Sequence, residues 1–412
     1  MRFSYIHAAD LHIDSPFSSL SSKDSAVAER FATAGRKAVE ALITETIESK
    51  SAFLIIAGDI FDGDWKDVTT GYFFAKELGR LKRAGIPVFL VKGNHDAENL
   101  MSRGLPYPDN VRSFASNKSE TFELKDLSVS LHGRSFGSRT VADDFVKSYP
   151  ARREGWLNIG VLHTALDGAR GHATYAPCSV DDLRQFGYDY WALGHVHAPA
   201  IVTQDPWIVY PGNLQGRSVR ETGKKGAVRV NVEDGRITGV EWLELDAARW
   251  AHETIDVSSC SIIEDVHEQI RVRLADVHGT CGGRPLAVRL TLQGATPHHA
   301  HLIVNQETFC EDARAVGLQI AEDCWVEQVK IATSELPLVQ SPLADADVID
   351  IGALLLRAAS DVEFTETVME LIKEITEKLP RSLRDHPDFI AGTDVGKLRE
   401  EARSYLMGRM QK

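Results

Sequence analysis

The stretch LVKGNHD, residues 90–96, is the segment of this 412-residue chain from which the fold and the site can first be inferred. An apolar run from Ile86 to Val91 ends at a glycine, and three side chains that can bind a metal or move a proton follow. A short apolar run of this kind is typical of a buried strand. In a mostly parallel sheet, ligand sites lie in the loops beyond the carboxyl ends of the strands. The stretch therefore predicts a chemical site at the end of a buried strand.

Four other segments have the same construction, in which an apolar run ends at metal-binding side chains. They are DLH at residues 10–12, GDIFD at 58–62, HT at 163–164 and GHVH at 194–197. Side chains at positions i and i+2 of an extended chain point to the same side. One ion can therefore be bound by the pair Asp10 and His12, and another by the pair His195 and His197. A lone histidine after a strand is more often structural, but five such segments in one chain indicate a shared site.

Helical patterns separate the apolar runs of the N-terminal part. We expect helices at residues 26–49, 73–84, 141–149 and 180–186, and strands at 3–9, 53–57, 88–91, 123–132, 157–162 and 190–193. Strands that alternate with helices imply a mostly parallel sheet. Further strands, at 207–210, 226–232 and on to 245, are expected to close the domain as hairpin-like strands.

The side chains at the strand ends form one candidate constellation for metal. Nitrogen and oxygen ligands without a thiolate suit manganese, iron or zinc. The candidate ligands are Asp10, His12, Asp59, Asn94, His163, His195 and His197. These residues can bind two ions only if one carboxylate bridges them. A pair of ions roughly 3.5 to 4 Å apart is typical of enzymes that act on phosphate esters. His95 is the candidate general acid for the leaving oxygen, and Asp96 is expected to orient its ring.

The order of these motifs resembles that of the calcineurin-like metallophosphoesterases. DxH, GDxxD, GNHD, a lone histidine and GHxH all occur, and the resemblance covers about residues 1–245. Residues 6–17 and 210–217 resemble the SbcD-type DNA double-strand-break repair nucleases, especially a bacterial DNA repair exonuclease branch. Some members of the wider family carry a histidine where Asp62 stands, so the role of Asp62 is open.

The resemblance implies an α+β/α/β fold, a four-layer αββα arrangement in which helices flank a β-sandwich, plus a small α/β capping domain and a C-terminal helical segment. It implies one metal held by Asp10, His12, Asp59 and His197, and another by Asp59, Asn94, His163 and His195. Asp59 would bridge two divalent ions, most simply Mn²⁺. The domains expected are 1–248 (nuclease), 249–333 (capping domain that helps admit DNA), 334–346 (linker) and 347–412 (helical).

Partners are expected from the same resemblance. The C-terminal helices would dock onto an SMC-like ABC ATPase of the SbcC type, and two copies of the nuclease domain would form a homodimer. From the residues alone, the apolar stripe of Phe364, Val368, Leu371, Ile375 and their neighbours must pack either on the body of this chain or on another chain.

Composition excludes several other classes. With a net charge of −13, the chain as a whole does not attract nucleic acid electrostatically. Attraction to DNA must therefore come from a local basic patch, the metals or a partner. Five cysteines without a CxxC pair argue against a disulfide framework or a thiolate zinc site. No apolar run approaches the roughly 20 residues that span a bilayer, so the cytoplasm is the expected location.

Three rival functions stay open at this stage. Protein phosphatases resemble GDxxDRG followed by GNHE, whereas this chain has Asp62-Gly63-Asp64 and then Asp96. A small-molecule phosphodiesterase fits the metal ligands equally well, and a scaffold that only binds metal would not need His95. Arg134, Arg217 and Arg220 are candidate phosphate contacts, although a solvated loop explains each of them as well.

Overall fold

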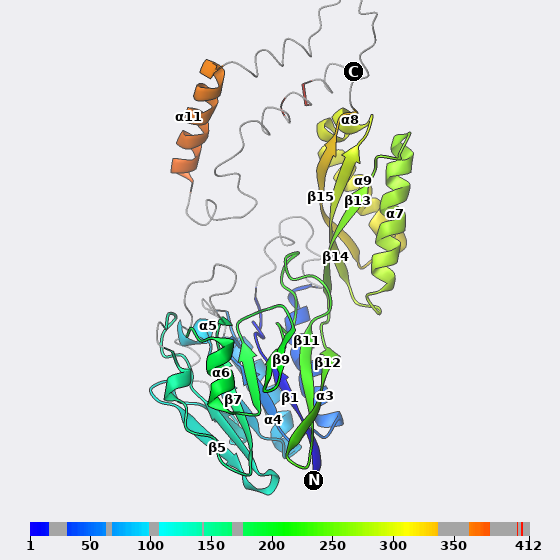
Figure 1. The fold of residues 1–412 in the computed structure, drawn as a ribbon. Helices are drawn as coiled ribbons and strands as arrows, with labels where there is room; N and C mark the ends of the chain where they lie inside the picture. The colour runs from blue at the N-terminus through cyan, green and yellow to red at the C-terminus, as the bar shows by residue number, and fades with distance from the viewer. Residues whose placement is uncertain are drawn as a thin grey trace, which may run out of the picture. The chain divides into compact units, whose positions relative to one another are not determined.

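The computed structural model describes residues 1–15, 31–62, 68–98, 107–141, 144–166, 176–336, 362–379, 402 and 405–406. The chain divides into two compact units (Figure 1). Unit 1 comprises Met1–Ala251 and His278–Ala287, and unit 2 comprises His252–Val277 and Val288–Lys412. All the candidate ligands belong to unit 1.

Unit 1 contains two six-stranded sheets. The first has the order β12 (Arg236–Glu244), β11 (Gly226–Glu233), β1 (Arg2–Ala8), β2 (Leu54–Ala57), β3 (Val88–Val91), β4 (Val111–Ser113). Its strands β1 to β4 pair in parallel, while β11 runs antiparallel to both β1 and β12. The carboxyl ends of β1, β2 and β3 therefore meet at one edge of this sheet.

The second sheet has the order β5 (Glu120–Leu124), β6 (Val129–Gly133), β7 (Leu157–His163), β8 (Tyr190–Gly194), β10 (Trp207–Tyr210), β9 (Ala200–Gln204). Its four central strands are parallel, and β5 and β9 pair antiparallel at the two edges. Both sheets are thus mixed, where the alternation of strands and helices had predicted one mostly parallel sheet.

Side-chain alternation along the central strands explains why the sheets pack face to face. On β1, Tyr5 joins the core between the two sheets, whereas Ile6 joins the core on the outer face of the first sheet. Successive strand residues point to opposite faces, so a strand that is apolar at every position is buried on both sides. Each of the central strands β2, β3, β7 and β8 is buried along its whole length.

Helices cover the two outer faces. Residues of α3 (Ala34–Glu48) and α4 (Val68–Arg83) pack against the first sheet, and α6 (Val180–Phe186) packs against the second. Ser179 and Asp182 form a capping box at the start of α6, and Gly187 ends the helix in a left-handed conformation. The layers are therefore helix, sheet, sheet and helix, which confirms the predicted sandwich.

Unit 2 is a small α/β unit. A three-stranded sheet of order β13 (Arg249–Asp256), β14 (Leu286–Ala295), β15 (Cys324–Ser334) is accompanied by α7 (Ile263–Gly279), α8 (His299–Val304) and α9 (Gln306–Ile320). Of the expected linker and C-terminal helical segment, the structure describes residues 334–336, helix α11 (Val362–Lys378) with Leu379, and residues 402 and 405–406. The remainder of both segments lies outside the described residues.

Two local predictions differ from the structure. Residues 123–132 were expected as one strand, but β5 and β6 are joined by a tight turn in which Ser128 has a φ of 52°. The strands β4 and β9 were not expected, because β4 is three residues long and both carry partly exposed side chains.

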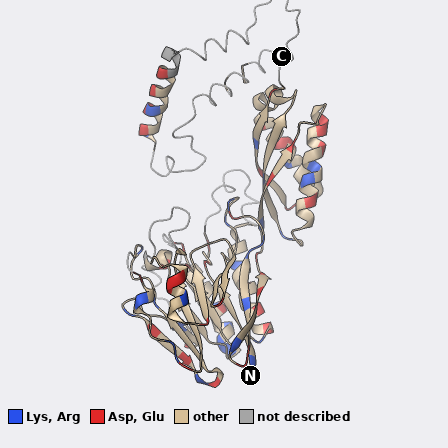
Figure 2. Cartoon of the chain, viewed as in Figure 1, with Lys and Arg blue, Asp and Glu red and all other residues tan. Residues whose placement is uncertain are grey.

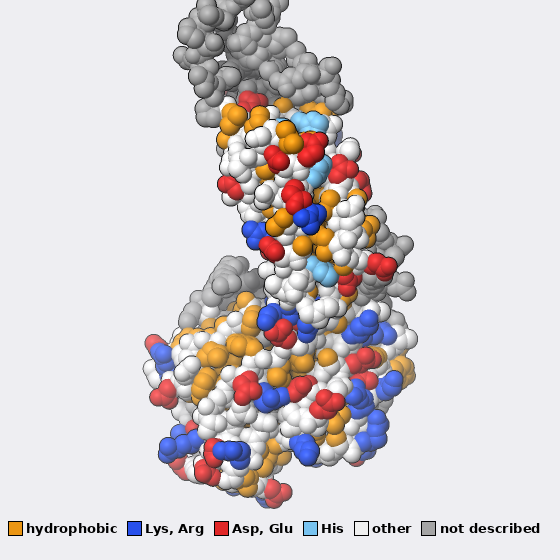
Figure 3. Space-filling view, turned by 90° about the vertical axis from the view of Figure 1, so that its right-hand side faces the viewer, with side chains coloured by type: hydrophobic (Ala, Val, Ile, Leu, Met, Phe, Trp, Pro, Cys, Tyr) orange, Lys and Arg blue, Asp and Glu red, His pale blue; other side chains and the backbone are white. Residues whose placement is uncertain are grey.

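Basic and acidic side chains are interspersed over both units (Figures 2 and 3). Among the described helices, none is long and apolar enough to cross a membrane.

Candidate metal centre

The candidate ligands come together where the strands of both sheets end. Asp10 and His12 follow β1, Asp59 follows β2, and Asn94 and His95 begin the short helix α5 (Asn94–Glu98) after β3. From the second sheet, His163 is the last residue of β7, and His195 and His197 follow β8. The five segments that the sequence singled out therefore converge.

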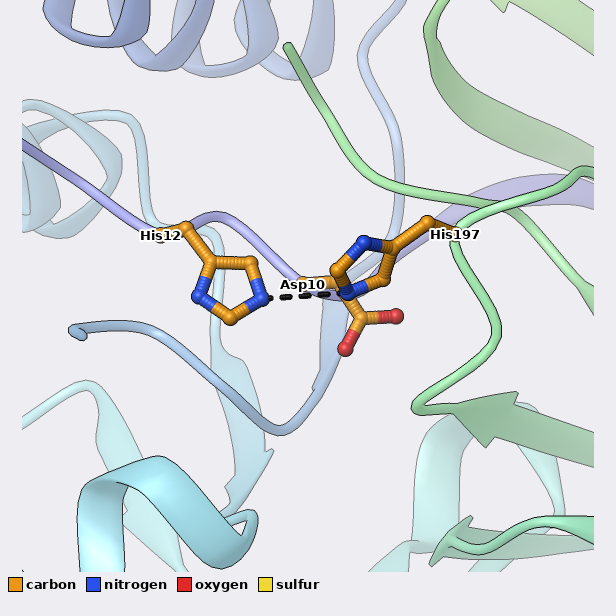
Figure 4. Close-up of side chains that lie close together, drawn as sticks. All are labelled: Asp10, His12 and His197. Atoms are coloured by element: carbon orange, nitrogen blue, oxygen red, sulfur yellow. Dashed lines mark hydrogen bonds between the residues drawn. The ribbon is translucent and has the colours of Figure 1, made fainter. Parts of the chain in front are cut away.

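A first group consists of Asp10, His12 and His197, whose ligand atoms all lie within 4.8 Å of one another (Figure 4). His12 Nε2 and His197 Nε2 are 3.2 Å apart. Asp10 is fully buried, and both of its carboxylate oxygens accept a hydrogen bond from the backbone N–H of His195, at 3.0 and 2.9 Å. This bond connects the first group to the loop after β8.

The hydrogen bonds behind the first group decide which ring nitrogen faces inward. His12 Nδ1 lies 2.8 Å from Asp62 Oδ1, and His197 Nδ1 lies 2.7 Å from Glu221 Oε1. A carboxylate can only accept, so each Nδ1 donates a proton and each Nε2 is left with its lone pair. Two lone pairs that face each other repel unless a cation lies between them. The donor set therefore fits a metal ion.

A second group consists of Asp59, His163 and His195, again with ligand atoms within 4.8 Å of one another. His163 Nδ1 donates to the backbone carbonyl of Ala57 at 2.9 Å. Its Nε2 then faces two oxygens, Asn94 Oδ1 at 3.0 Å and Asp59 Oδ2 at 3.3 Å. The side chains of the second group and Asn94 form a donor set of nitrogen and oxygen, which suits a divalent cation.

Asp59, a member of the second group, also faces the first group. Its Oδ1 accepts a hydrogen bond from the backbone N–H of His95 at 3.0 Å, which fixes the carboxylate. Its Oδ2 lies 3.3 Å from His163 Nε2 in the second group and 4.0 Å from His12 Nε2 in the first. One oxygen of Asp59 therefore faces ligands of both groups, as a bridging carboxylate must.

The electrostatics of the centre also favour a cation. Burial opposes the charge of Asp59, but the neighbouring His163 lowers the pKa of this carboxyl below its ordinary value. Burial likewise opposes the charge on His163, yet Asp59 and Asp10 raise the pKa of its imidazole to about 9. The carboxylates of the centre therefore favour positive charge at this position.

Strained backbone accompanies the ligands. Asp10, His12 and Asp59 have φ angles of 50°, 42° and 50°, and His195 has a φ of 96°. Non-glycine residues rarely adopt such angles, and they cluster at functional sites. The glycine within the opening motif is required for steric reasons, because a Cβ at Gly93 would collide with Asp59 Oδ1.

His95 and Asp96 have separate surroundings. The His95 side chain is 35% exposed, and its Nδ1 lies 3.8 Å from Asp62 Oδ1. Asp96 is buried, and its carboxylate accepts hydrogen bonds from the backbone N–H groups of Ile60, Phe61 and Gly93 at 3.0 to 3.2 Å. Asp96 was expected to orient the His95 ring. In the structure, the hydrogen bonds of the Asp96 carboxylate connect the loop after β2 to the loop after β3. Asp62 is the carboxylate beside His95 Nδ1.

The predicted substrate-binding arginines also have defined partners. Arg217 contacts Asp62 and Glu221, and its side chain is 22% exposed. Arg134 stacks on Phe145, with its guanidinium carbon 4.3 Å from the ring centroid, and donates to Ser116 O at 3.3 Å. These contacts hold Arg134 against Phe145, and its expected contact with substrate phosphate stays a prediction.

Sequence reasoning missed Glu221, which lies in a loop without a strand-end pattern and therefore carries no local signal. Two other buried histidines, His132 and His299, have ordinary hydrogen-bond partners. His132 bonds to Thr121 Oγ1 at 2.9 Å and Asn158 Oδ1 at 3.3 Å, and the buried His299 bonds to Thr333 Oγ1 at 2.8 Å.

A cavity of about 750 Å³ opens onto the centre. Asp59, Asn94, His95, His195 and His197 line it on the side of the centre. The rest of the lining includes the apolar Leu166, Val180, Val196 and Val202 and the basic Arg139, Arg220 and Lys225. The cavity can therefore admit a substrate larger than phosphate and present it to both groups.

Two family models match the chain. Residues 3–199 match the model described as calcineurin-like phosphoesterase, and residues 250–334 match the middle domain of the metallophosphoesterase YhaO. The chain is 28% identical over 423 residues to the uncharacterized metallophosphoesterase YhaO of Bacillus subtilis, covering 99% of this chain and 98% of that protein. It is 23% identical over 427 residues to the DNA double-strand break repair protein Mre11 of Methanopyrus kandleri, covering 94% of this chain and 86% of that protein.

Two solved structures are also similar. TT1561 of Thermus thermophilus has a TM-score of 0.34 and 12% identity, and covers 60% of this chain and 100% of its own. A dimetal phosphatase from Danio rerio has a TM-score of 0.34 and 12% identity, and covers 59% of this chain and 97% of its own.

Over residues 3–199 the chain is similar to the calcineurin-like phosphoesterases, and the sandwich in that part holds two groups of candidate metal ligands. Along nearly its whole length the chain is similar to YhaO, and its similarity to Mre11 is more distant. The SbcD-type branch stays a prediction.

Proposed function

We propose that this protein hydrolyses DNA phosphodiester bonds with two divalent metal ions, most simply Mn²⁺, as the nuclease subunit of a double-strand-break repair complex. The observation that carries the proposal is the position of Asp59 Oδ2, which faces both groups of ligands at the side of a cavity that His95 also lines. A site for one ion alone would not need a carboxylate shared in this way.

The chemistry divides between the metals and the chain. Two bound divalent cations supply Lewis-acid activation of water and neutralise charge on the phosphoryl oxygens. The first group and Asp59 would hold one ion, and Asp59, Asn94, His163 and His195 would hold the other. His95 reaches the cavity from between Asp59 and Asp62, from which it can give a proton to the leaving oxygen. Burial lowers the pKa of the His95 imidazole, and the nearby Asp59 and Asp62 carboxylates oppose this shift.

DNA as the substrate is supported by the similarity to Mre11 over 94% of this chain. Arg139, Arg220 and Lys225 supply local positive charge at the cavity, which a chain of net charge −13 needs for binding phosphate. The test is an assay with Mn²⁺ on linear duplex DNA, single-stranded DNA and bis-p-nitrophenyl phosphate, using the wild type and His95→Ala. We expect the wild type to cleave DNA and the variant to lose that activity. Metal binding without hydrolysis of any substrate would contradict the enzymatic proposal.

A second candidate is a phosphodiesterase for a small nucleotide or another phosphate ester. The apolar side chains on the cavity lining favour it, because Leu166, Val180 and Val196 could enclose one organic group. Hydrolysis of the small ester, with no cleavage of either DNA, would favour this candidate over the nuclease.

We also propose that the C-terminal helical segment docks onto an SMC-like ABC ATPase of the SbcC type and that the nuclease domain forms a homodimer. On α11, Met369, Leu371 and Ile375 are each more than half exposed. The test is a pull-down of the ATPase by the full chain and by a chain that ends at residue 344. Undiminished capture by the shortened chain would contradict docking through this segment, and light scattering of the full chain tests the dimer.

A further inference from the structure

We infer that Arg217 is a positioning residue that joins Asp62 and Glu221 into one clamp behind His12 and His197, and that this clamp makes the first group the tighter of the two metal sites. The inference rests on the two-metal centre of the proposed function. It does not depend on which phosphate ester is the substrate.

The two arms of the clamp are similar, except that in the Glu221 arm Arg217 Nη2 also lies 3.2 Å from His197 Nδ1. Asp62 Oδ1 accepts from His12 Nδ1 at 2.8 Å and from Arg217 Nη1 at 3.3 Å. Glu221 Oε1 accepts from His197 Nδ1 at 2.7 Å and from Arg217 Nη2 at 3.0 Å. In each arm, therefore, the oxygen that holds a histidine also contacts the one guanidinium. A planar fork with five donors can hold two carboxylates in a fixed relation, which a lysine cannot do.

The clamp is largely shielded from water, so its contacts are stronger than those of a surface ion pair. The exposed fractions of the side chains are 22% for Arg217, 28% for Asp62 and 13% for Glu221. Glu221 is held further by the backbone N–H of Arg217 at 2.8 Å and by Asn213 Nδ2 at 2.9 Å, both on Oε2. Both carboxylate oxygens of Glu221 are therefore fixed by hydrogen bonds.

The second group lacks this support at its best-defined histidine. His163 Nδ1 donates to a backbone carbonyl, that of Ala57, and not to a carboxylate. A carboxylate behind a ligating histidine fixes its tautomer and makes it a stronger donor, and loss of such a partner commonly costs about 10- to 100-fold in metal affinity. We therefore expect two separable binding steps, of which the tighter belongs to Asp10, His12 and His197.

The test measures Mn²⁺ binding by isothermal titration calorimetry on the full metal-free chain, with no substrate present. The variants are Glu221→Gln, Arg217→Lys and Arg217→Ala. We expect each of them to weaken the tighter step by about 10- to 100-fold and to leave the weaker step near its wild-type value. Arg217→Lys should not restore affinity, because an ammonium lacks the planar fork that fixes the two carboxylates relative to each other.

Arg229 offers a matched control. It is 24% exposed and pairs with two carboxylates, Glu45 and Glu241, on another part of unit 1. Arg229→Lys should leave both binding steps unchanged. The thermal unfolding temperature of each variant shows whether weaker metal binding comes from loss of the clamp or from a destabilised fold.

The rival role for Arg217 is direct contact with a substrate phosphate. That role predicts unchanged metal binding in Arg217→Lys, with a raised KM for bis-p-nitrophenyl phosphate at saturating Mn²⁺, and this result would overturn the inference. Equal weakening of both binding steps would also overturn it. Failure of the chain to cleave DNA would count against the proposed function only, because the titration contains no substrate.

Discussion

His12 and His197 point their Nε2 atoms at each other across 3.2 Å, although each ring already donates its Nδ1 proton to a carboxylate. Neutral imidazoles in these tautomers would repel one another at this distance. The chain thus maintains an arrangement that only a proton or a metal cation can satisfy. This arrangement is formed by loops that follow β1 in one sheet and β8 in the other, so the fold itself imposes it.

Replacement of the candidate general acid should separate chemistry from metal binding. His95→Ala is expected to lower kcat by about 10²- to 10⁴-fold, because general acid catalysis typically contributes that much. Its metal content should stay that of the wild type, since the proposed ligands are all retained. Steady-state kinetics and metal analysis on the same preparation check both points. His252→Ala, an exposed histidine of unit 2, is the control, and a His95→Ala enzyme of wild-type rate would show that another group gives the proton.

Asp59 should matter to both ions. Asp59→Asn is expected to reduce bound metal from two ions to one or none, because its Oδ2 faces ligands of both groups. Asp10→Asn should remove chiefly the ion of the first group. Metal content by inductively coupled plasma mass spectrometry distinguishes these results, with the exposed Asp126→Asn as the control. If Asp59→Asn kept two ions, Asp59 would not be the bridge.

A methyl group at Gly93 should disable the centre without removing any ligand. In Gly93→Ala the new Cβ would collide with Asp59 Oδ1 and come within 2.7 Å of the Asp59 backbone nitrogen, so the carboxylate must move. We expect metal affinity to fall at least about 10-fold, the scale of a lost supporting contact at a metal ligand, as titration with Mn²⁺ would show. At Gly239, in β12, an added Cβ has no neighbour within 4 Å, so Gly239→Ala is the matched control. Equal affinity in both variants would mean that the Asp59 loop adapts freely.

Acid should destabilise the fold through His7. This fully buried residue bonds to Tyr190 Oη at 3.0 Å and Leu193 O at 3.1 Å, and burial lowers its pKa to about 3. Between about pH 6.5 and 3 the unfolded chain binds a proton that the folded chain does not. The contribution of His7 to the free energy of unfolding is therefore complete above about pH 6.5 and falls by about 1.4 kcal/mol per pH unit as the pH drops.

Urea unfolding of wild type and His7→Gln over this pH range measures the effect of His7. The variant should show a smaller loss of stability per pH unit than the wild type. An identical dependence on pH in both proteins would mean that His7 is protonated in the folded state or does not titrate on unfolding.

The convergence of the candidate ligands could be predicted from the sequence because each follows an apolar run, and the carboxyl ends of parallel strands gather at one edge. The pairs Asp10 with His12 and His195 with His197 carry this signal most clearly. The partners behind the ligands could not be predicted in the same way. Glu221 is 24 residues from His197 and Asp62 is 50 residues from His12, so only the folded chain brings them together.

The role of Asp96 shows a second limit of sequence reasoning. Its neighbour in the chain is His95, which suggested a contact between the two side chains. In the structure, its carboxylate binds backbone N–H groups of Ile60 and Phe61, which lie 36 and 35 residues earlier in the chain. Backbone donors have no signature in the sequence, so a carboxylate that binds them cannot be told apart beforehand from one that binds a side chain.

The proposed ligands come from both sheets, and this division gives metal loading a meaning beyond catalysis. Asp10, His12, Asp59 and Asn94 follow strands of one sheet, whereas His163, His195 and His197 belong to the other. Each ion would thus cross-link two layers that are otherwise held together by apolar packing and by hydrogen bonds such as those of His7 to Leu193 O and of His163 Nδ1 to Ala57 O. We therefore expect metal uptake during refolding to coincide with the packing of the two sheets against each other. Removal of metal by a chelator should weaken this packing before the strands of either sheet separate.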